Sequence, residues 1–314
     1  MIEVDKLSKY FGERAAIRDL SFSIAKGEVV GFLGLNGAGK TTTLRILGCL
    51  LLPTSGTVRV DGLEVTQNPY EIRGKIGFLP DLPPLYPEMT VGAYLTFAAR
   101  LRQVPARDTA ARVAEAEERI ALRDMHGEII GELSHGYRQR VGLAQAIVHK
   151  PALLILDEPS AGLDPAQIVE MRNLVHGLRG EHTVLISSHF LTEISQTCDR
   201  LLVIHNGELV GQGSEGELAT AMGQGGSSIE VEVRGQPVGL GERLSKLPAV
   251  SKALGRSTTD NTTIFEIVAS ADVRAEVARL LVSSGCDLLR LERSESRLES
   301  IFMNLTQSPA GGPQ

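Results

Sequence analysis

The segment that decides the fold is GEVVGFLGLNGAGKTTTLRILGCLL, residues 27–51. Its first part, up to Leu33, is a short apolar run that is typical of a buried parallel strand. The part after residue 40 is apolar enough for a packed helix, which Pro53 would end. Between them lies the pattern G-x-x-x-x-G-K-[ST], formed by Gly34, Gly39, Lys40 and Thr41. Strand, glycine loop and helix in this order predict a phosphate-binding loop.

Such a loop binds a nucleoside triphosphate through its backbone. Glycines let the chain curl so that several N–H groups point at phosphate oxygens, and the helix N-terminus adds partial positive charge. The Lys40 ammonium would reach the terminal phosphates, and the Thr41 hydroxyl would bind Mg²⁺. The residues expected to contact ATP here are Gly34, Asn36, Gly37, Ala38, Gly39, Lys40, Thr41 and Thr42.

A pair of acids follows a second buried strand in ALLILDEP, residues 152–159. Unpaired buried charge is costly, and Mg²⁺ would explain a carboxylate at Asp157. Successive strand residues point to opposite sides, so Glu158 faces differently and could orient the attacking water. The alternative is an ordinary acidic turn after a strand. The phosphate loop earlier in the chain favours the metal site.

A third motif is LSHGYRQR, residues 133–140, which begins a segment of helical spacing with Ser134 as a favoured N-cap. This motif resembles the LSGGQ signature of ABC transporter ATP-binding subunits. Together with the two motifs above and His189 in ISSHF, it gives the chain its resemblance to that family. The resemblance covers about residues 2–213. It implies that Ser134 and Gly136 of one subunit cover the ATP held by a second copy, in a head-to-tail dimer that hydrolyses ATP.

The same resemblance implies roles for further residues. Phe11 matches the aromatic that stacks on adenine, although an ordinary core phenylalanine is the alternative. His189 matches the histidine that contacts the γ-phosphate, where the alternative is a structural histidine at a strand end. Residues 161–164, AGLD, match the loop between the two subunits. The implied catalytic residues are Glu158, His189 and Lys40.

The chain departs from the usual family pattern at three places. His135 replaces a glycine and Tyr137 replaces a glutamine, a variant that resembles exporters of the gliding-motility, polysaccharide and drug-resistance groups. Asp81 in IGFLPD stands where the family usually has glutamine. A carboxylate there would bind Mg²⁺ more strongly than an amide. The expected metal ligands are therefore Thr41, Asp81 and Asp157.

The organisation of the chain predicts two domains. We expect an α/β ATPase domain at residues 1–220, with an antiparallel β addition at its start and a helical subdomain at about 88–150. Within this subdomain, the apolar spacing of residues 109–125, TAARVAEAEERIALRDM, predicts an amphipathic helix. The proline-rich LPPLYPE, residues 82–88, is either a rigid loop or part of a groove for a membrane partner. Glycine and serine predict a linker at 221–228.

The C-terminal part reads as an α+β module at residues 229–306. The order βαββαβ, ending in a helix over RLESIFMNLT (297–306), indicates a ferredoxin-like domain. Residues 307–314 would be a disordered tail. An LE-x-IF-x-x-LT ending resembles that of other exporter ATPases.

Composition narrows the function classes. The net charge of −6 does not favour a nucleic-acid surface, and the longest apolar run, Ile46–Leu52, is too short to cross a bilayer. No charged-then-apolar leader is visible at the N-terminus. We therefore expect a cytoplasmic protein, peripheral on the cytoplasmic face of the membrane, with a separate polytopic permease as its partner.

Three other function classes fit less well. Chromosome-maintenance ATPases insert long coiled coils between phosphate loop and signature, whereas here that interval, 41–133, is short and contains prolines. Ribosome-acting ABC proteins carry two cassettes in one chain. A nucleotide-binding adaptor without turnover would not need Lys40, Asp157, Glu158 and His189 together.

Overall fold

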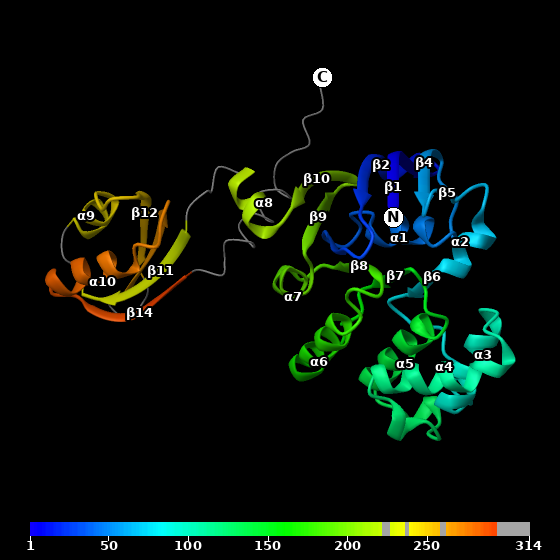
Figure 1. Cartoon of the computed structure of the whole chain (residues 1–314). Coiled ribbons are helices and arrows are strands. Elements are labelled where there is room, and N and C mark those ends of the chain that lie inside the picture. Colours follow the sequence, from blue (N-terminus) through cyan, green and yellow to red (C-terminus); the bar gives the residue numbers. More distant parts are fainter. Residues whose placement is uncertain (222–226, 236–238, 258–261, 294–314) are drawn as a thin grey trace. The chain divides into compact units, whose positions relative to one another are not determined.

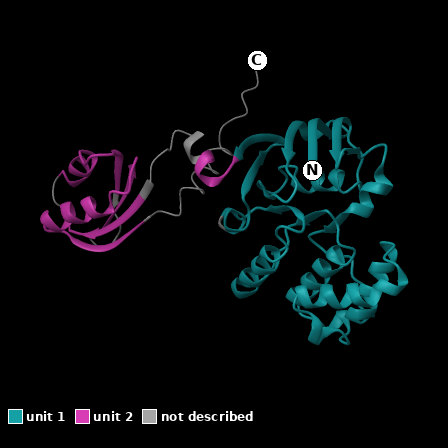
Figure 2. Cartoon of the chain, viewed as in Figure 1, with its two compact units in different colours: residues 1–212 teal, residues 213–314 magenta. Residues whose placement is uncertain are grey.

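The computed structural model describes residues 1–221, 227–235, 239–257 and 262–293 (Figure 1). The chain divides into two compact units, Met1–Gln212 and Gly213–Gln314 (Figure 2). Helix α8 (Glu215–Ala221) therefore falls in the second unit, although the sequence assigned it to the first. Strand β11 begins at Ser227, inside the segment assigned to the linker. The boundaries drawn from the sequence stay predictions.

The first unit is built on a six-stranded sheet in the order β10-β9-β3-β8-β7-β6. Its strands are β3 (Val29–Leu33), β6 (Ile76–Leu79), β7 (Leu153–Asp157), β8 (Thr183–Ser188), β9 (Arg200–His205) and β10 (Glu208–Gly213). The pairs β3–β8, β3–β9, β6–β7 and β7–β8 are parallel. Every residue of β3, β7 and β8 is buried, as expected of parallel strands covered on both faces.

Alternate residues of β7 enter two different cores. Leu153 and Ile155 pack with helix α1 (Lys40–Leu47) and the antiparallel sheet, whereas Leu154 and Leu156 pack with the helical part. The antiparallel sheet has the order β2-β1-β4-β5. Its strands are β1 (Ile2–Phe11), β2 (Arg14–Ile24), β4 (Ser55–Val60) and β5 (Leu63–Glu64). The short helix α2 (Pro69–Lys75) leads into β6.

The helical part lies between β6 and β7 in the chain, as predicted, and Figure 1 shows its helices grouped together. It comprises α3 (Val91–Leu101), α4 (Ala106–Arg119), α5 (His135–Ile147) and the 3₁₀ turns Arg123–Met125 and Ile130–Glu132. Thr90 caps α3 by accepting a hydrogen bond from the Ala93 amide at 3.3 Å. Helix α4 ends sooner than its periodicity suggested, since Ala121 turns to a φ of 52°. Helices α6 (Pro165–His176) and α7 (Leu191–Thr197) follow β7 and β8.

The second unit contains an antiparallel four-stranded sheet in the order β12-β13-β11-β14. Its elements are β11 (Ser227–Arg234), α9 (Leu240–Ser245), β12 (Val250–Ser257), β13 (Thr262–Ala269), α10 (Arg274–Ser283) and β14 (Asp287–Arg293). Inward residues such as Val231, Phe265 and Val277 form its own core. This is the βαββαβ ferredoxin-like arrangement that the sequence predicted.

Two sequence predictions, the final helix at 297–306 and the tail at 307–314, lie outside the described residues. No helix within the described ranges combines the length and the apolar character needed to cross a membrane.

Candidate functional site

The predicted site residues gather at the carboxyl ends of three parallel strands. Leu33 is paired with Ser188, and Asp157 with Ser187, so β3, β7 and β8 end level with one another. A cavity of about 540 Å³ opens beside these ends. It is lined by Phe11, Arg14, Ala15, Ala16, Leu35, Asn36, Gly37, Gly39, Lys40, Thr41, Thr42, Asp81, Glu158, Ala161 and His189.

The loop before α1 has the conformation that a phosphate loop requires. Gly37 and Gly39 have φ angles of 84° and 106°, where side chains other than glycine are strained. A Cβ on Gly39 would lie 2.6 Å from the Ala16 carbonyl oxygen. Helix α1 begins at Lys40, so its first backbone N–H groups and the positive end of its dipole face the cavity.

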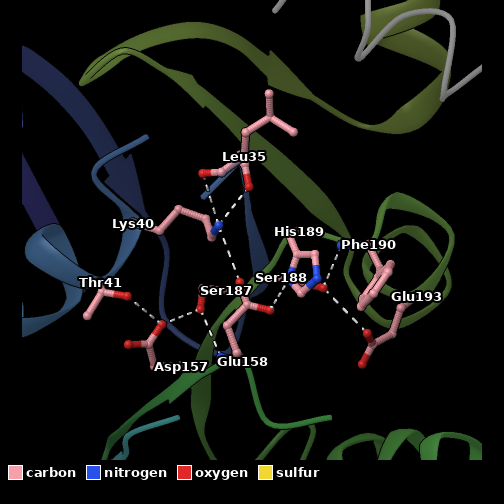
Figure 3. Close-up of polar contacts among 11 residues, drawn as sticks. Leu35, Lys40, Thr41, Asp157, Glu158, Ser187, Ser188, His189, Phe190 and Glu193 are labelled. Atoms are coloured by element: carbon pink, nitrogen blue, oxygen red, sulfur yellow. Dashed lines mark hydrogen bonds and ion pairs between the residues drawn. The ribbon is translucent and has the colours of Figure 1, made fainter. Parts of the chain in front are cut away.

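Lys40 is held inside the loop. Its Nζ donates to the Gly34 carbonyl at 2.6 Å and its side chain is 6% exposed. The same Nζ lies 3.3 Å from Glu158 Oε1 (Figure 3). The other carboxylate oxygen of Glu158 is 2.8 Å from His189 Nδ1. Glu158 thus lies between a fixed cation and an imidazole.

Asp157 is buried below this group. Its Oδ1 accepts from the Ser187 hydroxyl at 2.6 Å and from the Thr41 hydroxyl at 3.3 Å. Burial raises the pKa of Asp157 above its ordinary value, and the two hydroxyl bonds oppose that rise. The neighbouring Glu158 and Asp81 carboxylates raise this pKa further.

The arrangement fits Mg²⁺. The Asp157 carboxylate and the Thr41 hydroxyl are close together, and oxygen is the ligand that Mg²⁺ prefers. A buried carboxylate whose pKa is raised by burial and by neighbouring negative charge is stabilised when a cation binds beside it.

Ser187 was not identified from the sequence. Its hydroxyl donates to Asp157 and also accepts the Glu158 amide at 3.0 Å, so one side chain fixes both acids. The available signal was the pair of serines in ISSHF, because a buried apolar strand that ends in hydroxyl groups needs partners for them.

Phe11 lines the cavity and is 53% exposed, so it is not the core residue of the alternative interpretation. Gly34 and Ala38 do not line the cavity. Gly34 permits a close approach to β9, since a Cβ there would lie 2.6 Å from the Ile204 carbonyl oxygen. Ala38 belongs to the loop and its side chain is buried.

Ser134 and Gly136 are absent from the lining of this cavity. Ser134 caps α5 by accepting from the Tyr137 amide at 3.4 Å. Gly136 lies against α6, where an added Cβ would be 2.8 Å from Gln167 Oε1. One chain therefore does not bring its signature residues to its own phosphate loop, and their assignment to the site of a second copy stays a prediction.

The three departures from the family pattern have different surroundings. His135 Nε2 lies 3.0 Å from the Ala161 carbonyl oxygen of the same chain. The Arg140 guanidinium lies 5.2 Å from the centre of the Tyr137 ring. Asp81 lines the cavity, and its backbone carbonyl accepts from Gln139 Nε2 at 3.0 Å.

Comparison with known proteins agrees with this geometry. The family model described as ABC transporter matches residues 17–161. The bacitracin transport ATP-binding protein BcrA of Bacillus licheniformis is 32% identical over 307 residues, covering 97% of each chain. The linearmycin resistance ATP-binding protein LnrL of Bacillus subtilis is 30% identical over 315 residues, covering 98% of each chain. Both relatives therefore extend over the second unit as well.

One similar solved structure is the dimeric post-hydrolysis state of an ATP-binding cassette bound to ADP and Pi. It has a TM-score of 0.62 and 25% identity, and covers 68% of this chain and 98% of the cassette. The shared family, fold and phosphate loop establish ATP with Mg²⁺ as the ligands and ATP hydrolysis as the reaction. The chain belongs to the ATP-binding subunits of ABC transporters, exporter type.

Proposed function

We propose that two copies of this chain bind two ATP molecules head to tail and power export through a separate membrane permease, on the cytoplasmic face of the membrane. The observation that carries the proposal is the Lys40–Glu158–His189 group beside the Thr41–Asp157 pair. These residues come from the ends of two strands, β7 and β8, and from the N-terminus of helix α1. A protein that only bound nucleotide would not need a carboxylate held by an imidazole.

The proposed roles follow from position and charge. The Lys40 ammonium neutralises the terminal phosphates, which takes it away from Glu158. Glu158 then keeps His189 as its partner and accepts the proton of the attacking water. Thr41, Asp157 and Asp81 would hold Mg²⁺, which neutralises charge on the phosphate oxygens.

Phe11 would stack on adenine. The phosphates would be surrounded by the loop that begins at Gly34 and includes Asn36, Gly37, Ala38, Gly39 and Thr42. Ser134 and Gly136 of the second copy would complete the site at the γ-phosphate. The dimeric arrangement of the similar cassette supports this assignment. The N-terminus of α5, capped by Ser134, offers an anion the same helix dipole as α1 does.

A groove between α2 and the helical part is the proposed permease site. It has a volume of about 540 Å³ and includes Pro84 and Tyr86 of the LPPLYPE segment. The groove is rimmed by the exposed side chains of Tyr70, Leu101 and Phe97. Arg73 and Arg102 also line it, so an apolar helix of the permease that carries an acidic residue fits. One relative is named for bacitracin transport and the other for linearmycin resistance, and these names support a compound of that kind as the exported substrate.

Purification from native membranes in mild detergent tests the proposal. We expect a polytopic permease to co-purify with the wild type and to be lost with Leu101→Glu, which puts a charge on the groove rim while ATP hydrolysis continues. Val282→Glu is the matched control, because Val282 is similarly exposed at 65% against 70% but belongs to the second unit. Recovery of ribosomes or DNA in place of a permease, or equal loss in both variants, would contradict it.

A further inference from the structure

The imidazole of His135 points into its own chain. His135 is the first residue of α5 and the third residue of the LSHGYRQR motif. Its Nε2 is 3.0 Å from the Ala161 carbonyl oxygen, and a Cβ added to Gly162 would lie 3.2 Å from the same nitrogen. A carbonyl only accepts hydrogen bonds, so Nε2 must carry the proton. The contact therefore assigns one tautomer to the neutral ring.

Ala161 belongs to the turn that carries Glu158. The Ala161 amide donates to the Glu158 carbonyl at 3.0 Å, and the Glu158 amide donates to the Ser187 hydroxyl at 3.0 Å. Glu158 has a φ of 50°, a left-handed conformation that costs a residue with a side chain about 1 kcal/mol or more. The surrounding bonds must hold this turn for the carboxylate to stay beside Lys40 and His189.

We infer that His135 is a positioning residue for Glu158 of its own subunit. The imidazole fixes the Ala161 carbonyl, Ala161 closes the Glu158 turn, and the turn aims the carboxylate. The signature segment, residues 133–140, would contact the ATP of the second copy. Through His135 it is thereby linked to Glu158, the general base of its own site. Glycine, the usual family residue here, has no side chain and cannot form this link. The inference rests on the proposed role of Glu158.

Two amide variants distinguish a hydrogen bond to the Ala161 carbonyl from mere packing by the His135 side chain. In His135→Gln the side-chain amide nitrogen reaches about as far as Nε2 and can donate to Ala161. In His135→Asn the amide is one methylene shorter and cannot reach it. We expect kcat of the full-length protein to fall about threefold to tenfold in His135→Asn, as for one lost hydrogen bond, with KM for ATP unchanged. His135→Gln should restore most of kcat.

A second readout does not depend on turnover. Nitrogen-15 NMR of histidine-labelled wild type without nucleotide reports the tautomer, and His135 is assigned by the signal missing in His135→Asn. We expect the Nε2–H form. The Nδ1–H form would overturn the inference.

The two proposals fail in different ways. The catalytic role of Glu158 stands if wild type hydrolyses ATP and Glu158→Gln does not. The positioning role of His135 is then wrong if kcat of His135→Asn equals that of wild type. It is also wrong if kcat of His135→Gln is as low as that of His135→Asn. If Glu158→Gln retains turnover, the role of Glu158 fails, and the positioning role that rests on it fails as well.

Discussion

Ser187→Ala is the perturbation that most directly probes how the two acids are held. The Ser187 hydroxyl is fully buried, donates to the Asp157 carboxylate at 2.6 Å and accepts the Glu158 amide at 3.0 Å. The Glu158 amide also donates to the Ser187 backbone carbonyl at 3.2 Å, so in the alanine variant it loses only one of its two acceptors. Asp157 keeps only the longer bond from Thr41 at 3.3 Å.

The main loss is therefore one hydrogen bond to a buried carboxylate. A bond to a charged group contributes about 1.5–3 kcal/mol, so we expect the free energy of unfolding to fall by about 2 kcal/mol. For a unit of this size that corresponds to a decrease in Tm of about 4–8 °C.

The loss should depend on pH with a definite sign. Burial already raises the pKa of Asp157, and the Ser187 bond is the largest cause that lowers it. Removing that bond raises the pKa further. A carboxyl whose folded pKa lies above its unfolded value destabilises the fold as pH rises from the unfolded pKa through the folded one. The Tm difference between variant and wild type should therefore be largest at neutral pH and should narrow on acidification, as Asp157 becomes neutral in both proteins.

Thermal unfolding of the full-length protein between pH 5 and pH 8 measures this difference. Ser188→Ala is the matched control, because Ser188 is also a buried serine of β8 that accepts one amide, from Phe190, and donates to one carboxylate, that of Glu193. Its hydroxyl bonds Phe190 and Glu193 rather than Asp157, so its Tm difference should not share this pH dependence. A Ser187→Ala difference that is constant with pH, or equal to that of Ser188→Ala at every pH, would show that the Ser187 hydroxyl does not control the ionisation of Asp157.

Two further predictions concern ligands. Phe11→Ala should leave Tm nearly unchanged, since the ring is already half exposed, but should weaken ATP binding about tenfold, as for one lost stacking contact; calorimetric titration measures this, and unchanged affinity would mean that Phe11 does not meet the base. Asp81→Gln, which restores the usual family residue, should raise the Mg²⁺ concentration needed for half-maximal turnover because an amide is the weaker ligand; an unchanged Mg²⁺ dependence would remove Asp81 from the metal site.

The sequence predicted the parts of the fold that depend on local pattern. The β3–loop–α1 segment, the buried β7 before Asp157 and the order of elements in the second unit all follow from apolar periodicity and glycine placement, and the structure confirms them. Helix α4 was predicted too long because the apolar spacing continues past Arg119 while the backbone reverses at Ala121. Periodicity carries no information about such a turn.

The sequence could predict those parts of the candidate site that lie within one short motif, such as the phosphate loop or the acidic pair after β7. Contacts between distant segments were not. Ser187 meets Asp157 across neighbouring strands, His135 meets Ala161 across a helix and a loop, and Gln139 meets the Asp81 backbone across subdomains. Each contact depends on how strand ends and helix starts are brought together, which a spacing rule within one segment does not contain.

If the proposed function is right, ATP joins two copies of this chain and Glu158 drives its hydrolysis. Sedimentation of purified Glu158→Gln with ATP and Mg²⁺, alongside phosphate release, tests both parts together. We expect an ATP-dependent dimer that does not form with ADP, and turnover about a hundredfold or more below wild type. A variant that binds ATP but stays monomeric, or that still turns over at about a tenth of the wild-type rate or faster, would contradict the proposed function.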